Sequence, residues 1–317
     1  MLMEWPVSDN VWKDDLTDAR EAFAQVARSI AGFEPVTIIA NPQAAEEARK
    51  QCQSNSGYRV EVLSLAHDDC WVRDNGPTFL KDEKGALCAV NWHFNAWGGI
   101  YGHWELDNTI PERLCKLWNI PLRNADLVLE GGSIHTNGKG VILTTEECLL
   151  NKNRNPHLGR QQIEEKVLEN LGAHKMIWLP FGLYGDETSG HVDNICCFID
   201  ESTALLAWTD EPASPNFERV RKAKTVLREN GISVEALPLP PNIEDSERVL
   251  APSYINFVFV NGGIVMPAFG GGAERESEEA KHRLSLLFPS REIVSPDTSC
   301  IIKGGGNIHC ITQQVPL

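Results

Sequence analysis

The stretch GPTFLKDEKGALCAVNWHF, residues 76–94, sets the pattern from which the fold can be worked out. Its two apolar runs are separated by a polar turn that ends in glycine, which predicts a β-hairpin. A helix-like segment at 111–119 and a strand-like segment at 125–130 follow. The order strand, strand, helix, strand predicts a ββαβ module.

The same order of elements recurs three more times along the chain, although the residues themselves are not repeated. Each further module begins with a predicted hairpin, continues with an amphipathic helix and ends with a strand. The hairpins cover 132–150, 194–210 and 254–269, the helices 156–172, 216–231 and 274–288, and the final strands 175–180, 232–239 and 291–295. Four modules are therefore expected.

The two ends of the chain supply a fifth module. Strand material at 301–314 can pair with residues 1–6, followed by a helix at 17–32 and a strand at 35–40. Joining the ends closes a ring and leaves no exposed sheet edge. We therefore expect one closed α/β domain over residues 1–317, a five-bladed pseudo-symmetric α/β-propeller. On pattern alone, an ordinary mixed α/β sheet is the alternative.

The composition excludes several classes of protein. A net charge of −15 argues against binding to nucleic acid, which requires a basic surface. No apolar run reaches the roughly 18 residues that a membrane-spanning helix needs, and the first residues do not resemble a signal peptide. Nine cysteines, an odd number without a CxxC motif, indicate buried thiols in a reducing, cytoplasmic compartment. The oligomeric state, including a homo-oligomer, is left open.

Polar residues occur at one equivalent place in each module, just before or at the start of the hairpin. These residues, about 60 positions apart, are Asp74, Glu130, His191, Tyr254 and Cys310. Equivalent positions in a ring of modules would face one axis and converge. The set then contains a candidate nucleophile, a candidate proton-transfer group and carboxylates.

Each of these residues also has a structural interpretation when it is considered alone. Asp74 could form an Asx-turn, Glu130 could face solvent, and His191 and Cys310 could belong to the core. Their shared position in the modules favours the functional interpretation. His191 and Asp193, two residues apart, would point to the same face of a strand.

Five motifs in unbroken order resemble the agmatine deiminase branch of the peptidyl-arginine deiminase family, within the guanidino-group-modifying enzymes. They are WVRDNGPTF (71–79), FNAWGG (94–99), LEGGSIHTNGKG (129–140), GHVDN (190–194) and GGGNIHCITQQ (304–314). The resemblance extends from about residue 5 to residue 316. It implies a five-bladed α/β-propeller.

The resemblance also implies roles for individual residues. Cys310 matches the nucleophile, His191 the general acid and base, and Glu130 a carboxylate that bonds the ligand or orients His191. The residues expected to bind substrate are Asp74, Asp193, Trp71 and Trp97.

The implied reaction is hydrolytic deimination of agmatine to N-carbamoylputrescine and ammonia, a step in putrescine biosynthesis from arginine. Two carboxylates can accept paired hydrogen bonds from a guanidinium while a thiolate attacks its central carbon. The intermediate is an amidino group on cysteine. The expected partner is a small cationic guanidino substrate, and neither a metal nor an organic cofactor is required.

Three alternatives remain at this point. The substrate could be free or peptidyl arginine. His191, Asp193 and Cys310 could instead be the metal ligands of a hydrolase, which chelation would inactivate. The third alternative is a non-catalytic propeller, because family members have a further segment before the position of Trp5.

Overall fold

The structure, a computed structural model, describes residues 1–7, 9–53, 57–241, 243 and 249–316. The chain divides into two compact units. Unit 1 comprises Met1–Val72 and Pro238–Gln314, and unit 2 comprises Arg73–Leu237 and Val315–Leu317. The described residues form five small sheets of mixed parallel and antiparallel strands, so the α/β class is confirmed.

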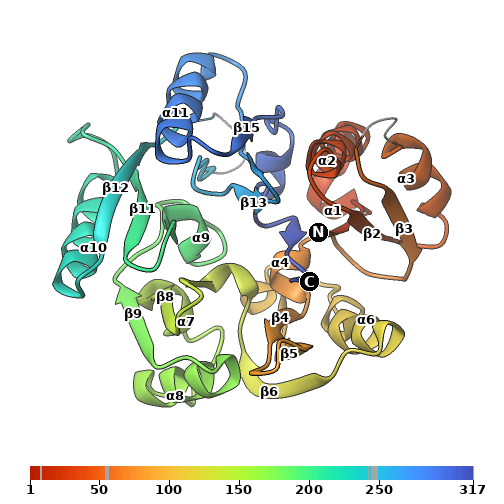
Figure 1. The fold of residues 1–317 in the computed structure, drawn as a ribbon, viewed down its shortest axis with the longest axis horizontal. Helices are drawn as coiled ribbons and strands as arrows, with labels where there is room; N and C mark the ends of the chain where they lie inside the picture. The colour runs from red at the N-terminus through yellow and green to blue at the C-terminus, as the bar shows by residue number, and fades with distance from the viewer. Residues whose placement is uncertain (8, 54–56, 242, 244–248, 317) are drawn as a thin grey trace. The chain divides into compact units, whose positions relative to one another are not determined.

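Unit 2 contains three of these sheets, each with the predicted ββαβ order (Figure 1). In the first module, β4 (Thr78–Lys81) and β5 (Leu87–His93) form the expected hairpin. Helix α6 (Ile110–Trp118) then leads to β6 (Leu122–Val128), which runs parallel to β5. A helix between parallel strands is the usual way to make such a crossover.

The next two modules of unit 2 repeat this arrangement. The second consists of β7 (Ile134–Thr136), β8 (Val141–Thr145), α8 (Arg160–Leu171) and β9 (Lys175–Leu179). The third consists of β10 (Cys196–Phe198), β11 (Thr203–Trp208), α10 (Phe217–Glu229) and β12 (Ser233–Pro238).

A shared apolar core joins the first two modules of unit 2. Trp92 and Leu127 from the first sheet belong to the same buried cluster as Ile163 of α8 and Trp178 of β9. Each module alone is too small to bury its apolar face, so neighbouring modules stabilise one another.

Unit 1 contains the other two sheets. One consists of β13 (Val258–Val260), β14 (Gly263–Val265) and β15 (Glu292–Val294), with α11 (Glu274–Leu287) before the last strand. The other has the order β16-β1-β2-β3 and consists of β16 (Thr312–Gln313), β1 (Leu2–Glu4), β2 (Val36–Ala40) and β3 (Val60–Ser64).

The two ends of the chain meet in this last sheet. Strand β1 pairs antiparallel with β16, Leu2 lying opposite Gln313, and parallel with β2. The predicted pairing of the ends is therefore confirmed. Helix α2 (Leu16–Ala31) lies between β1 and β2 in sequence, as expected. Whether all five sheets close into a propeller within one domain stays a prediction.

Two features of unit 1 differ from the sequence-based expectation. Helix α3 (Ala45–Gln51) and strand β3 were not predicted, because α3 is short and buries only two alanines, which gives a weak apolar period. In the predicted strand 301–314, only Thr312 and Gln313 form a β-strand. Residues Ile301–Gly304 form a 3₁₀ turn, and Gly305 adopts a φ of 104°, which interrupts a strand.

Several short helical segments connect the larger elements. The α-helical ones are α1 (Asp9–Trp12), α4 (Val72–Asn75), α5 (Ala96–Gly99), α7 (Glu146–Leu149) and α9 (Val192–Ile195). The 3₁₀ ones are η1 (Lys13–Asp15), η2 (Asp107–Thr109), η3 (Gly131–Ser133) and η4 (Ile301–Gly304). Within the described ranges, no helix combines the length and apolar composition needed to cross a membrane.

Replacing Leu2 tests how strongly strand β1 is held. Leu2 is fully buried, so Leu2→Ala should lower the free energy of unfolding by about 2–5 kcal/mol through lost burial and a residual cavity. Urea denaturation followed by circular dichroism measures this change. The matched control is Leu286→Ala on α11, where the side chain is 67% exposed and the expected change is within about 0.5 kcal/mol. Equal losses of unfolding free energy in both variants would contradict the prediction that burial of Leu2 in β1 stabilises the fold.

Candidate active site

Unit 2 brings four of the predicted residues to one buried place. Asp74 lies in α4, Glu130 follows β6, His191 precedes α9, and Asp193 lies within α9. All four side chains are buried. Buried carboxylates require compensating charges or hydrogen bonds, so their surroundings determine what the site can do.

Gly132 lies at the centre of this group. Its backbone N–H donates to Oδ1 of Asp74 at 2.9 Å. A Cβ at this position would lie 2.6 Å from Nδ1 of His191, 2.9 Å from Oδ1 of Asp74 and 3.0 Å from Oδ2 of Asp193. The three side chains therefore surround one glycine, and only a residue without a side chain leaves room for them.

The local structure at His191 differs from the expected strand. Ser189 and Gly190 both have positive φ, and His191 then begins the single turn of α9. The backbone N–H of His191 donates to Oδ2 of Asp186 at 3.1 Å, which fixes the start of this turn. The prediction that His191 and Asp193 share a strand face was wrong, yet both side chains approach Gly132.

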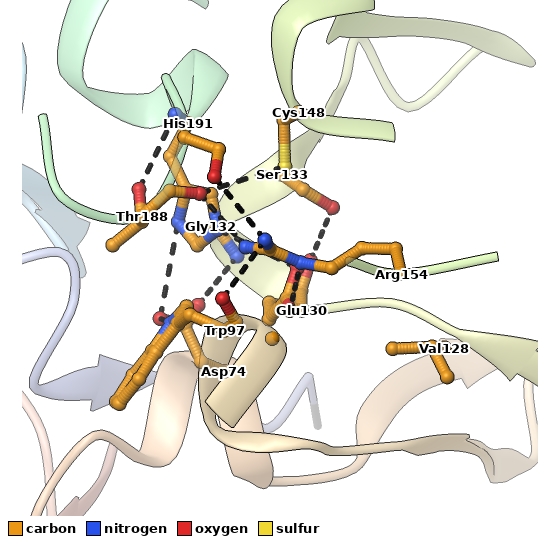
Figure 2. A network of polar contacts seen from close by, with 12 residues as sticks. Asp74, Trp97, Val128, Glu130, Gly132, Ser133, Cys148, Arg154, Thr188 and His191 are labelled. Atoms are coloured by element: carbon orange, nitrogen blue, oxygen red, sulfur yellow. Dashed lines mark hydrogen bonds and ion pairs between the residues drawn. The ribbon is translucent and has the colours of Figure 1, made fainter. Parts of the chain in front are cut away.

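The imidazole of His191 lies between two carboxylates (Figure 2). Its Nδ1 is 3.8 Å from Oδ2 of Asp74, and its Nε2 is 3.6 Å from Oε2 of Glu130. Burial by itself lowers the pKa of His191, but Asp74, Cys148 and Glu130 together raise this pKa well above its usual value. These groups therefore favour the charged form of the histidine, which can donate a proton.

Asp74 is held by the Trp97 indole, whose Nε1 donates to its Oδ2 at 2.9 Å. Trp97 and the preceding Ala96 adopt φ values of 54° and 52°, a left-handed conformation that is uncommon for residues other than glycine. Burial raises the pKa of Asp74 to about 6, with Asp193 and Glu130 adding to the rise and His191 opposing it. A positively charged ligand beside Asp74 would therefore stabilise the ionised form of this carboxyl group.

Arg154 is a residue of this site that the sequence analysis missed. Its Nε donates to Oε1 of Glu130 at 2.7 Å, and both side chains are fully buried. Burial raises the pKa of Glu130, but Arg154 and His191 outweigh this effect and leave the pKa below its usual value. Arg154 lies in a polar loop, NKNRNP, whose composition resembles that of an ordinary surface loop, so the sequence contained little signal.

Cys148 of α7 was also missed, since it lies in an apolar run like several other cysteines. Its Sγ, a nitrogen of His191 and a carboxylate oxygen of Glu130 lie within 4.8 Å of one another. Such a triplet could in principle hold a metal ion. However, the guanidinium of Arg154 already supplies positive charge to the same carboxylate. We therefore interpret the triplet as part of the surroundings of His191.

Unit 1 contains the predicted nucleophile. Cys310 is buried in the turn before β16, and Nδ2 of Asn256 donates to its Sγ at 3.2 Å. The Oδ1 of the same amide accepts from the backbone N–H of His309 at 2.9 Å, which fixes the orientation of Asn256. Asn256 was missed because Tyr254 represented this module, whereas Tyr254 is a core residue whose hydroxyl bonds Ser277 at 2.9 Å.

Trp71 lies beside Cys310 within unit 1. A Cβ at Gly306 would lie 2.6 Å from the Trp71 ring and 3.1 Å from Sγ of Cys310, so Gly306 lies between them. The Trp71 indole donates to Oδ2 of Asp69 at 2.9 Å and stacks on Trp12, with ring centroids 5.9 Å apart. The structure thus places Trp71 and Cys310 together in unit 1, and Trp97 with Asp74 in unit 2.

Comparison with known proteins assigns the chain to a family. The model of the Porphyromonas-type peptidyl-arginine deiminases matches residues 1–316. The chain belongs to this family. Within it, the chain is 42% identical over 343 aligned positions to an agmatine deiminase of Stutzerimonas stutzeri and to one of Pseudomonas aeruginosa, covering 99% of this chain and 92% of each relative.

Solved structures of the same family are also similar to this deiminase-family chain. An agmatine deiminase of Enterococcus faecalis aligns with a TM-score of 0.93 and 33% identity, over 99% of this chain and 92% of the other. A cysteine-to-serine variant of the C. jejuni agmatine deiminase, with substrate bound, aligns with a TM-score of 0.90 and 31% identity, over 98% and 91%. The family found by comparison agrees with the resemblance seen in the motifs.

Gly132→Ala tests the packing of the site. The added methyl group would meet His191, Asp74 and Asp193, so we expect a loss of about 1–3 kcal/mol in the free energy of unfolding. Urea denaturation measures this loss. Gly102→Ala is the matched control, because a Cβ there meets no other atom within 4 Å, and its expected change is within about 0.5 kcal/mol. Indistinguishable stabilities would show that these side chains do not surround Gly132.

Proposed function

We propose that this protein is an agmatine deiminase, which hydrolyses agmatine to N-carbamoylputrescine and ammonia. The observation that supports this most directly is the cluster of buried carboxylates around Gly132, in a chain 42% identical to agmatine deiminases. A planar guanidinium can pair with two carboxylates at once, and its charge offsets their mutual repulsion. The protein is a hydrolase that acts on C–N bonds of linear amidines.

In the proposed reaction, the thiolate of Cys310 attacks the central guanidinium carbon and forms a tetrahedral adduct. His191, in the charged form that its neighbouring carboxylates favour, protonates one terminal nitrogen, which leaves as ammonia. An amidino-thioether remains on Cys310. The neutral His191 then removes a proton from water, the resulting hydroxide attacks the same carbon, and the thiolate leaves as the ureido product forms.

This reaction requires the Cys310 thiolate and the His191 imidazole to reach one carbon atom. The requirement follows from the chemistry and is part of the proposal, as is the closure of the five sheets into a five-bladed propeller. The cysteine-to-serine variant of the C. jejuni agmatine deiminase, with substrate bound, supports a cysteine nucleophile. Asn256, bonded to Sγ of Cys310, would keep the nucleophile in place between attack and release.

Substrate binding is assigned to Asp74, Asp193, Trp71 and Trp97, with Glu130 acting on His191. Asp74 and Asp193 supply the negative charge, and Trp97 orients Asp74 through its indole N–H. A neutral analogue would leave the buried carboxylates without a compensating charge. The site should therefore bind the guanidinium cation in preference to such an analogue. The proposed partner is therefore a small guanidino cation.

Agmatine is favoured over free or peptidyl arginine. Arginine has an α-carboxylate that needs its own positive partner, commonly an arginine side chain. Arg154 does not fill this role, because each nitrogen of its guanidinium already donates to a protein acceptor. The similar proteins of Stutzerimonas stutzeri and Pseudomonas aeruginosa are agmatine deiminases, which also supports agmatine as the substrate.

Other parts of the proposal concern the surroundings of the enzyme. A reducing, cytoplasmic compartment is supported by the cysteines, all nine of which lie in the described part of the chain as free thiols. The net charge of −15 supports a function that does not involve nucleic acid. The non-catalytic alternative is not favoured by the comparisons.

Replacing Cys310 tests the proposed function. Purified wild-type protein should release ammonia and a ureido product from agmatine in the presence of EDTA, and Cys310→Ala should lower kcat by roughly 10³-fold or more. Cys88→Ala is the control, because this half-buried thiol lies in strand β5. Normal turnover by Cys310→Ala, or loss of wild-type activity in EDTA, would refute the mechanism. Faster turnover of arginine would refute the choice of substrate.

The affinity for agmatine should depend on pH through Asp74. This carboxyl has a pKa of about 6, whereas the pKa of Glu130 lies below its usual value and that of His191 well above. Below pH 6 Asp74 gains a proton and loses its attraction for the cation, so binding to Cys310→Ala should weaken about tenfold per pH unit. Calorimetric titration between pH 5 and 8 measures this.

The control for the pH dependence is Asp126→Asn, because the Asp126 side chain is exposed. That variant should show the same pH dependence of binding as its parent. Asp74→Asn should bind agmatine weakly at every pH, without the transition near pH 6. Retention of that transition in Asp74→Asn would assign it to another group.

A further inference from the structure

Arg154 contacts three separate segments of the site in unit 2 (Figure 2). Besides the 2.7 Å bond to Glu130, its NH1 group donates to the backbone carbonyl of Trp97 at 3.0 Å. Its NH2 group donates to the carbonyl of Thr188 at 2.8 Å. NH1 also reaches Oδ1 of Asn153 at 2.7 Å and Oγ of Ser189 at 3.2 Å. One buried side chain thus joins parts of the chain that are far apart in sequence.

The contact with Trp97 links Arg154 to Asp74, a residue proposed to bind the guanidinium. Trp97 and Ala96 adopt left-handed backbone conformations, which persist only when their surroundings impose them. Arg154 bonds the carbonyl of this strained segment, and the Trp97 indole in turn bonds Asp74. The position of Arg154 therefore affects the orientation of a carboxylate that binds substrate.

The contacts with Thr188 and Ser189 act on the acid–base histidine. These residues directly precede Gly190 and His191, and Ser189 also has a positive φ. Asp186, at the start of the same loop, accepts hydrogen bonds from the backbone N–H groups of Thr188 and of His191. Arg154 and Asp186 thus both hold the turn that carries the imidazole.

The contact with Glu130 acts on the charge of the histidine. One oxygen of this carboxylate bonds Arg154, while the other faces Nε2 of His191 at 3.6 Å. A guanidinium fixed in this way keeps Glu130 ionised and oriented. An ionised Glu130 favours the charged imidazole that donates the proton.

We propose that Arg154 is a positioning residue that couples guanidinium recognition by Asp74 and Trp97 to proton transfer by His191. This inference rests on the proposed deiminase function. Arg154 itself does not touch the reacting atoms. It acts through Trp97, Glu130 and the loop before His191, and a displacement of about 1 Å in such groups can cost roughly 10² in rate.

Lysine at this position separates the proposal from a purely structural role. A lysine ammonium can pair with Glu130 and so avoid a buried unpaired charge, which would be strongly destabilising. It lacks the planar fork that reaches Glu130, Trp97 and Thr188 together. Arg154→Lys should therefore fold while the two loops lose their common anchor. Arg154→Met, which leaves Glu130 without its arginine partner, serves only to measure the cost to folding.

The experiment compares Arg154→Lys with wild type and with Arg123→Lys, whose side chain pairs with Glu169 on the surface. Thermal unfolding first establishes the fraction folded. Steady-state kinetics with agmatine should show, for Arg154→Lys, a KM raised about tenfold and a kcat lowered about tenfold, so kcat/KM falls about 10². The acid limb of its kcat/KM profile should also move to higher pH. Arg123→Lys should match wild type in each measurement.

Two results would overturn the inference. One is a folded Arg154→Lys with wild-type kcat, KM and pH profile, which would limit Arg154 to a structural role. The other is a change confined to KM or to kcat, which would show that recognition and proton transfer are not coupled. A wild-type protein that does not deiminate agmatine would instead refute the proposed function. In that case, calorimetric titration of agmatine into Cys310→Ala, with and without Arg154→Lys, still measures whether Arg154 affects the affinity for agmatine.

Discussion

The burial of several carboxylates beside one histidine is the constraint on which the site in unit 2 depends. Asp74, Glu130 and Asp193 are all removed from water, and ionised groups in such a place need compensating charge. Arg154 and the charged form of His191 supply part of it, which leaves the site with an excess of negative charge. A guanidinium is the ligand that relieves this excess, so affinity and selectivity for a cation have the same physical origin.

The backbone shows where this arrangement imposes strain. Ala96, Trp97 and Ser189 all have positive φ although none is a glycine, and all three lie in segments that contact Arg154 or precede His191. Gly132, by contrast, is needed for its missing side chain, since three functional side chains occupy the space around it. Hydrogen bonds from Arg154 to the carbonyl of Trp97 and to the hydroxyl of Ser189 help to hold these conformations.

Much of the fold could be predicted because the hairpins and helices follow local rules. The turns at 81–85 and at Asn137-Gly138 mark two hairpins, and the apolar face of α8 ends at Gly172 as expected. Helix α3 and strand β3 escaped prediction because they bury few large apolar side chains. The strand expected around Cys310 was replaced by a turn, since consecutive glycines tolerate conformations that a strand excludes.

The sequence by itself determined the repeated module, the pairing of the chain ends and the chemical types of the candidate catalytic and binding residues. Asp74, Glu130, His191 and Cys310 could be selected because each occupies an equivalent place in its module and belongs to a recognisable motif. Only the tertiary structure revealed Arg154, Cys148 and Asn256, and only it showed His191 at the start of a helical turn. The reason is physical. A residue's role in a buried network depends on partners that are distant in the chain, and no local periodicity records those contacts.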